Sequence, residues 1–345
     1  MFRILKDQCR RHPILWGFLL TRAAILLIGV ATLTHKPLTE DDIPGDYHRP
    51  AVAFKALEMW SRWDAEWYMA IAEVGYNGPI DSTYDMRPAL FPLFPYLVRG
   101  VYKLTGNLIL SGLLLSNTCL LVFLLCLYRL VRIDFDDGAA ARAVWLYLLF
   151  PSSLFLSGIY AESLLLALSV GAALAARKGK FAVAGILSGA ALVTRPVGCL
   201  VCILVGIEWL AASGLRLNRK NLLQLATIVL LPAGAAVAYY MFAQRTFVTP
   251  LEFMNIQQRY RGNMTWPWRS FISFWQNGPV LHAYDNSIYD ATLAGISLLL
   301  IPLIAWRSRI SYAAFAAANI LMALSTSLVS FNRIVVGAFP CFIIV

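Results

Sequence analysis

Apolar runs separated by short polar segments recur along nearly the whole chain. Nine of these runs predict membrane-spanning helices, near residues 14–34, 107–128, 140–158, 163–176, 181–194, 197–213, 222–243, 291–306 and 310–330. A helix needs about 20 apolar residues to cross a bilayer. Several runs are shorter than this, so pairs of them could be tilted, re-entrant or only partly inserted. A further run opens at residue 334 and the chain stops inside it, so we expect an incomplete C-terminal span.

The composition agrees with this pattern. Hydrophobic residues make up 59% of the 345 residues and charged residues 14%, and the mean hydropathy is +0.65. A soluble protein could not bury so much apolar surface. We therefore predict an all-α polytopic membrane protein, folded as one integral membrane domain over 1–345, with about 9–10 or more transmembrane helices.

The six cysteines do not form the pattern of a disulfide framework, because five lie inside apolar spans and Cys9 lies in a basic head. Cys199 and Cys202 have CxxC spacing, but no histidine or second cysteine pair accompanies them. We assign no metal site.

The charges predict the orientation of the chain. A basic head over 1–13 precedes the first span, and no small-residue cleavage site follows, so we expect this span to remain uncleaved. With the N-terminus in the cytoplasm, the short cytoplasmic segments are rich in Lys and Arg, as the positive-inside rule requires. Two long loops, 35–106 and 244–290, then lie on the other side. The net charge of +10 reflects this topology and does not indicate a nucleic-acid partner.

This orientation has a consequence for function. Five ionic residues far apart in the sequence all fall on the non-cytoplasmic side, together with the loop 244–290: Asp64, Arg87, Glu162, Arg195 and Arg333. One outward-facing site could collect them.

The stretch SRWDAEWYMAIAEVGY, residues 61–76, predicts a helix with one aromatic stripe. The stripe contains Trp60, Trp63, Trp67, Ile71 and Val74, and Arg62, Glu66 and Glu73 fall on the opposite face. We expect a helix that lies in the membrane interface, with its aromatic side in the headgroup region and its glutamates solvated.

Asp64 lies at the edge of that stripe, where partial desolvation raises its basicity. Two interpretations stay open. The carboxylate could cap or orient a neighbouring backbone or arginine, or it could be catalytic.

Two proline-containing segments carry arginines. In DMRPALFPLFPY, residues 85–96, three prolines forbid a regular helix, and Arg87 could bind a phosphate bidentately. Arg195-Pro196 interrupts an apolar pair of half-spans; a helix kink explains the proline but not the arginine. In the second long loop, RYRGNMTWPWRSF, residues 259–271, alternates cations with aromatics, which could stack on a sugar or anchor the loop at the interface.

These segments carry a resemblance. WDAEWYMAIAEVGY followed by ALFPLFP, then FPSSLFLSGIYAESLL at 150–165 and LVTRPVG at 192–198, is similar to the motif series of the PIG-V (GPI mannosyltransferase 2) family of GT-C-type membrane glycosyltransferases. The resemblance runs from Arg22 to about residue 200. The loop 244–290 has no counterpart that we can pair, and Leu90 stands where the family often has an aromatic residue.

The resemblance implies a GT-C-like helical bundle and an inverting transfer of mannose from a polyprenyl-phosphate donor to a lipid-linked or glycan acceptor. Asp64 would be the general base, because such a single displacement needs one base near the acceptor hydroxyl. Arg87, Arg195 and Arg333 would bind the donor phosphate, and Trp63, Trp67, Tyr68, Tyr160 and Glu162 would contact the substrates.

No soluble cofactor is implied, and the expected partners are membrane lipids and the two lipid-linked substrates, with protein partners left open. A bacterial plasma membrane fits the short chain and lean loops; a eukaryotic member would lie in the endoplasmic reticulum. A transporter or flippase, or a non-catalytic membrane subunit, remains as an alternative, although we find no internal repeat of the 61–95 pattern.

Overall fold

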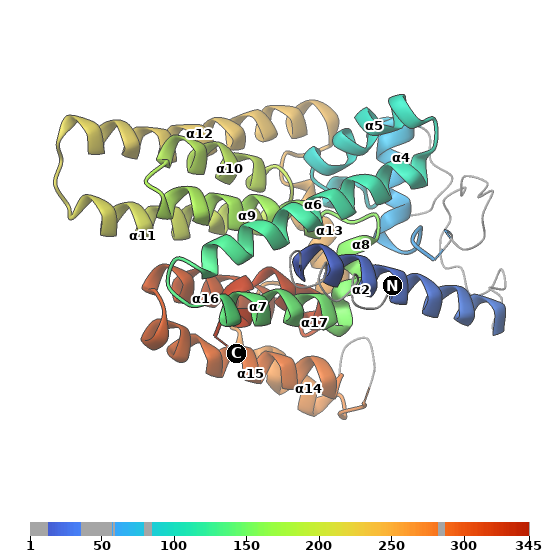
Figure 1. Ribbon diagram of the computed structural model, residues 1–345. Coiled ribbons are helices and arrows are strands. Elements are labelled where there is room, and N and C mark those ends of the chain that lie inside the picture. The colour runs from blue at the N-terminus through green and yellow to red at the C-terminus, as the bar shows by residue number, and fades with distance from the viewer. Residues whose placement is uncertain (1–12, 36–56, 58, 79–84, 282–286, 345) are drawn as a thin grey trace.

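The computed structural model describes residues 13–35, 57, 59–78, 85–281 and 287–344, and these residues fold almost entirely into helices (Figure 1). The basic head and much of the first loop lie outside the described residues. The α-helices in chain order are α2 (Pro13–His35), α4 (Asp64–Val74), α5 (Leu93–Thr105), α6 (Leu108–Val131), α7 (Asp137–Leu149), α8 (Leu154–Ser157), α9 (Glu162–Arg177), α10 (Phe181–Leu192), α11 (Val201–Ser213), α12 (Arg219–Thr246), α13 (Glu252–Arg261), α14 (Trp268–Gln276), α15 (Ile288–Arg307), α16 (Ile310–Leu324) and α17 (Phe331–Ile334). The 3-10 turns are η2 (Arg87–Ala89), η3 (Pro151–Ser153), η4 (Pro196–Leu200), η5 (Val335–Gly337) and η6 (Phe339–Phe342).

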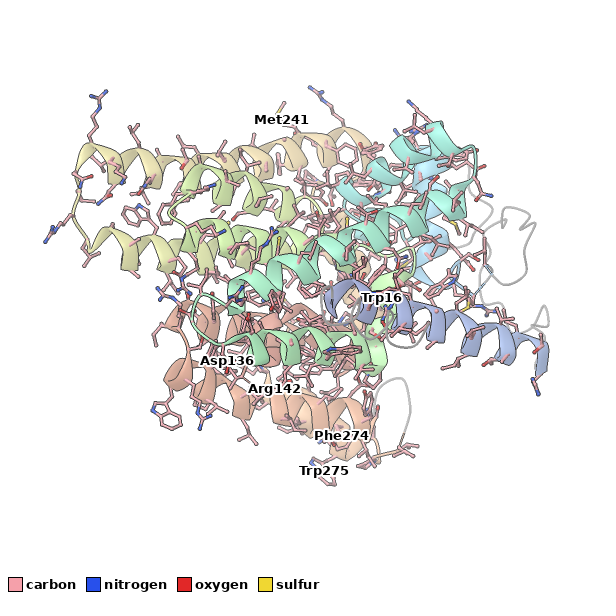
Figure 2. The ribbon with its side chains drawn as sticks, viewed as in Figure 1. Trp16, Asp136, Arg142, Met241, Phe274 and Trp275 are labelled. Atoms are coloured by element: carbon pink, nitrogen blue, oxygen red, sulfur yellow. The ribbon has the colours of Figure 1, made fainter. Side chains whose placement is uncertain are left out.

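The long helices run side by side, and the short helices α4 and α5 gather at one end of the bundle (Figure 1). Helix α9 lies at the centre, where it packs against α6, α10 and α11, and α10 packs against α12. The outward faces carry apolar side chains such as Met241 on α12 and Trp275 on α14 (Figure 2). A bundle with apolar side chains both inside and outside is typical of a protein that spans a membrane.

Within the described residues, five helices are long and apolar enough to cross a membrane. They are Ile14–His35, Leu108–Val131, Pro196–Ser213, Arg219–Thr246 and Ile288–Arg307. Asp137–Leu149 and Pro151–Ser157 meet at a bend of 76° and add a sixth if they form one span, and Phe181–Leu192 and Ile310–Leu324 are shorter apolar helices. The all-α membrane fold is confirmed, and the larger number of crossings stays a prediction.

The helix expected over residues 61–76 begins later and is more deeply buried than the sequence predicted, and its position in the membrane interface stays a prediction. Helix α4 begins only at Asp64, so Trp60 and Trp63 precede it. Ile71 and Glu66, which were placed on opposite faces towards lipid and water, are both buried. The reason is tertiary: α4 packs against both α5 and α6 and forms an apolar cluster with Phe94 and other residues. The sequence periodicity could not indicate that both faces would be covered.

The proline-rich segment follows the prediction only in its first half. Arg87–Ala89 forms a single 3-10 turn, but α5 begins at Leu93 and contains Pro95 in its first turn. A proline is tolerated there because the first amide groups of a helix have no partner within the helix.

The predicted span that opens at residue 334 is not a long helix in the described part of the chain. Residues 331–342 form α17, η5 and η6, whose side chains lie in the protein core. Phe342 stacks on Tyr147 at 4.1 Å between ring centroids, and the Tyr147 hydroxyl donates to the Val336 carbonyl at 2.8 Å. These contacts hold the segment across α7.

Candidate active site

Four ionic residues from four distant segments meet in one cluster. Nη1 of Arg333 lies 2.7 Å from Oδ2 of Asp64, and its Nε lies 2.5 Å from Oε1 of Glu162. Nη1 of Arg195 lies 2.6 Å from the same Glu162 oxygen, as an ion pair without hydrogen-bond geometry. We call Asp64, Glu162, Arg195 and Arg333 the ionic cluster. Its two cations and two carboxylates balance in charge.

Each residue of the ionic cluster lies at the end of a helix, in a short helix or in an extended segment. Asp64 and Glu162 are the first residues of α4 and α9, where the helix dipole favours a negative charge. Arg195 has extended backbone between α10 and η4, because the residue before a proline is disfavoured in helical conformation. Arg333 lies in α17, a helix of four residues.

Two aromatic rings support the Arg333 guanidinium. Its central carbon lies 4.6 Å from the ring centroid of Tyr160 and 5.1 Å from that of Phe155, which are distances of cation–π contacts. The Tyr160 hydroxyl donates to the carbonyl of Arg62 at 2.6 Å and so ties its ring to the segment that precedes Asp64. Burial lowers the pKa of Arg333, but the charges of Glu162 and Asp64 outweigh it and raise that pKa well above its usual value. Arg333 therefore remains a cation.

The side chains of the ionic cluster differ in their exposure to solvent. The exposed fraction of the side chain is 37% for Asp64, but only 10% for Glu162 and 15% for Arg333. Buried Oε2 of Glu162 and Nη2 of Arg333 have no hydrogen-bond partner in the described part of the chain. Because buried polar atoms are normally paired, the cluster has unused hydrogen-bonding capacity.

The three aromatic residues predicted beside Asp64 have different surroundings. Trp63 is 59% exposed and has a φ of 54°, which is rare for a residue with a side chain. Trp67 is half-buried. Tyr68 is only 1% exposed and packs edge-to-face on Phe94 at 4.9 Å, so its ring belongs to the core. The charges of the ionic cluster nevertheless act on its hydroxyl group, and a contact of Tyr68 with substrate stays a prediction.

The structure does not bring Arg87 into the ionic cluster. Its Nε and Nη2 each lie 2.9 Å from one carboxylate oxygen of Asp85, and its Nη1 donates to the carbonyls of Gly75 and Gly78. Since the side chain is 6% exposed, we interpret Arg87 as a residue that closes the loop after α4, in place of the predicted phosphate ligand.

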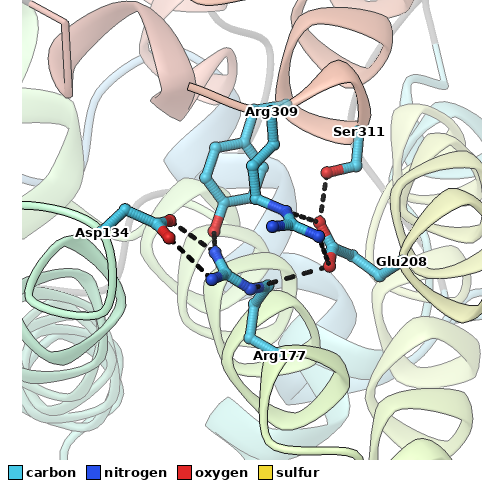
Figure 3. Close-up of polar contacts among 6 residues, drawn as sticks. Asp134, Arg177, Glu208, Arg309 and Ser311 are labelled. Carbon is cyan, nitrogen blue, oxygen red and sulfur yellow. Dashed lines mark hydrogen bonds and ion pairs between the residues drawn. The ribbon is translucent and has the colours of Figure 1, made fainter. Parts of the chain in front are cut away.

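A second ionic network joins other helix ends (Figure 3). Arg177 donates to both oxygens of Asp134, and Arg309 donates to both oxygens of Glu208, which also accepts from Ser311. Arg177 and Glu162 are the last and first residues of α9, so the two networks lie about 22 Å apart along this helix. The network therefore joins helix ends remote from the ionic cluster.

The acidic segment after α6 has structural contacts. Asp136 caps α7 by accepting from the amide of Ala139, and Asp137 pairs with Arg132. Asp134 pairs with Arg177 as described above, so each of the three aspartates has a structural contact.

The second long loop is attached to the end of α16. Arg261 donates to Thr326 and Ser327, and the amide of Thr265 donates to the Ser325 carbonyl. The exposed rings of Trp266 and Trp268 stack at 4.9 Å. A cavity of about 640 Å³ is lined by Met264, Thr265, Trp266, Pro267, Arg269 and Ser325.

Sequence reasoning missed three residues around Arg333. Phe155 contacts its guanidinium, and Asp290 and Asn332 bond to each other beside it. The only sequence signal was their predicted location: Asp290 and Asn332 fall in non-cytoplasmic segments, and Phe155 lies near the outer end of the predicted span 140–158. Many other residues share these locations.

The comparisons with known proteins agree on one family and one fold. A family model described as mannosyltransferase (PIG-V) matches residues 19–290. The GPI alpha-1,6-mannosyltransferase 2 of Cricetulus griseus is 33% identical over 153 residues, which cover 40% of this chain and 29% of that protein.

Among solved structures, the apo oligosaccharyltransferase of Archaeoglobus fulgidus is similar with a TM-score of 0.50 and 15% identity. The match covers 96% of this chain and 50% of that one. The likeness is therefore one of fold, of the GT-C type, and the chain spans about half the length of that enzyme.

Proposed function

Because the chain belongs to the mannosyltransferase (PIG-V) family, we propose that it transfers mannose from a polyprenyl-phosphate donor to a hydroxyl group of a lipid-linked or glycan acceptor. The reaction takes place on the non-cytoplasmic face of the membrane and inverts the anomeric centre. The GT-C-type fold supports a glycosyltransferase more generally.

The observation that carries the proposal is the accessible carboxylate of Asp64 beside the two partly buried arginines of the ionic cluster. Of the two carboxylates in the ionic cluster, Asp64 is the one that a substrate can reach. Glu162 is enclosed between Arg195 and Arg333, so its role is to hold the arginines. Phosphate recognition favours arginine, whose planar group bonds to two oxygens at once.

The reaction is a single displacement. Asp64 accepts the proton of the acceptor hydroxyl while its oxygen forms a bond to the anomeric carbon of the mannosyl group. The bond from that carbon to the phosphate oxygen breaks, and the leaving polyprenyl phosphate keeps the electron pair. Arg333 and Arg195 stabilise the negative charge that develops on the phosphate.

The resting contacts suggest an order of binding. Asp64 is bonded to Arg333, so its Oδ2 already accepts a hydrogen bond from the guanidinium. A donor phosphate competes for the same guanidinium and so releases Asp64. We therefore propose that the donor binds before the acceptor is deprotonated.

Asp64→Asn tests the central assignment. We expect transfer from radiolabelled polyprenyl-phosphate mannose into membrane lipid to fall about 100- to 10,000-fold, the contribution typical of a general base. Binding of the donor should be retained, because the amide leaves the arginines in place.

Glu73→Gln is the matched control, since Glu73 is an exposed carboxylate near the other end of α4. Its transfer rate should equal that of the unmodified protein. Undiminished transfer by Asp64→Asn would remove the assignment of the base, and no transfer by the unmodified protein with any polyprenyl-phosphate hexose would remove the proposed function.

A further inference from the structure

A buried carboxylate lies behind the turn that carries Arg333. Asp290 is in the first turn of α15 and is 4% exposed. Its Oδ1 accepts two hydrogen bonds from Asn332, one from the backbone amide at 2.6 Å and one from the side-chain Nδ2 at 2.8 Å. Charge-assisted bonds of this kind are stronger than those between neutral groups.

The turn is also held from the other side. Oδ1 of Asn332 accepts from the Ser152 hydroxyl at 2.8 Å, and Ser152 lies in η3, next to the segment that carries Phe155. Asn332 thus joins α15 to η3, and the next residue is Arg333. The side chain of Asn332 therefore connects the turn that carries Arg333 to the segment that carries Phe155, one of the rings that Arg333 contacts.

This turn cannot hold its shape by itself. Helix α17 has four residues, which is too short for cooperative helix formation. It follows its N-cap residue Ser330, whose φ of 54° lies in the left-handed region that a residue with a side chain rarely adopts. Its conformation therefore depends on contacts with the rest of the protein.

Arg333 requires that the turn be placed accurately. Its guanidinium contacts Asp64, Glu162 and two aromatic rings at the same time, and a displacement of the turn would break several of these contacts together. We propose that Asp290 is a positioning residue, which holds the Asn332–Arg333 turn so that Arg333 reaches Asp64 and Glu162. The inference rests on the proposed function where it takes Arg333 as a ligand of the donor phosphate.

The test combines Asp290→Asn with Arg333→Lys. Asp290→Asn keeps the size of the side chain and removes its charge, and we expect the KM for the donor to rise about tenfold, since misplacement of a binding group costs one to two orders of magnitude. In the Arg333→Lys background, Asp290→Asn should have no further effect, because a residue that acts only through Arg333 couples fully to it. Equal effects of Asp290→Asn in both backgrounds would overturn the proposal.

Glu208→Gln is the matched control. Glu208 is also a carboxylate that is 4% exposed and accepts several hydrogen bonds, but it lies in the second network at the far end of α9. It should lower the thermal unfolding temperature and leave the donor KM unchanged. The same rise in KM for Glu208→Gln would mean that Asp290 acts through general stability, against the proposal.

A binding measurement separates this inference from the proposed function. Binding of undecaprenyl phosphate, which carries no sugar, is followed by tryptophan fluorescence of the purified full chain. The unmodified protein is compared with Asp290→Asn, Arg333→Lys and the double variant. Coupled losses of affinity would support the positioning role even if mannose is not the transferred sugar. Wild-type affinity in Asp290→Asn would overturn it while leaving the transferase reaction standing.

Discussion

Arg333 holds two carboxylates through different nitrogen atoms. Its Nε faces Glu162 and its Nη1 faces Asp64, so the fork of the guanidinium sets the spacing between the two acids. Lysine has the same charge but a single ammonium group without this fork. The residue is thus required for its shape as well as its charge.

For Arg333→Lys we expect a loss of catalytic efficiency of about 10- to 100-fold, because one hydrogen bond to a charged group contributes about 1.5–3 kcal/mol. Steady-state transfer assays with the donor varied would measure it. Arg309→Lys changes an arginine with similar bonds to Glu208 and should leave the donor KM unaltered. Equal kcat/KM for Arg333→Lys and the unmodified protein would contradict the role given to the guanidinium.

At the scale of elements, the segment that carries Arg195 passes very close to the end of α10. A Cβ atom on Gly198 would collide with the backbone carbonyl of Ala191. The amide of Leu93 donates to the carbonyl of Val193 at 3.1 Å, so the start of α5 is attached to the same place. The close approach explains why a glycine stands at 198, three residues after the arginine.

Gly198→Ala should therefore destabilise the protein by about 1–3 kcal/mol, the usual cost of overpacking a core, and should displace Arg195. Thermal unfolding in detergent and the donor KM would both report it. Gly206→Ala is the comparison, since nothing lies within 4 Å of a Cβ at that position in α11 and alanine is the better helix former. A Gly198→Ala protein as stable as Gly206→Ala would show that the backbone tolerates a side chain there.

At the scale of the whole molecule, the two ionic networks mark opposite ends of α9. From the basic segments we predict that Arg177 lies on the cytoplasmic side and the ionic cluster on the opposite side. The loops at the two ends of the bundle should lie on opposite sides of the membrane in the same way. We therefore expect the segment after α5 and the segment after α12 to lie together on the non-cytoplasmic side.

Cysteine labelling tests this orientation. With the six native cysteines replaced by alanine, Leu104→Cys and Val248→Cys should react with a membrane-impermeant maleimide added from outside, because these side chains are 88% and 95% exposed. Leu215→Cys, between α11 and α12 and 73% exposed, should react only after permeabilisation. The reverse pattern would place the ionic cluster in the cytoplasm and exclude the proposed face of reaction.

The sequence by itself determined the class of fold and predicted the side of the membrane on which each charge lies. Long apolar runs can be stable only in a bilayer, and the excess of basic residues in short loops orients them. Counting the predicted spans from the N-terminus predicts one common side for Asp64, Glu162, Arg195 and Arg333, without any knowledge of distances. The aromatic and proline motifs further identified the family to which the chain belongs.

Only the tertiary structure decided which of those charges meet. Arg87 shares the same predicted side, yet its donors are used by Asp85 and two carbonyls close in sequence, whereas Arg333 bonds to Asp64, 269 residues away in sequence. The burial of Glu66 and the link from Asp290 to Asn332 have the same origin. Such contacts depend on how helices distant in sequence pack, and residue type and local periodicity carry no information about that packing.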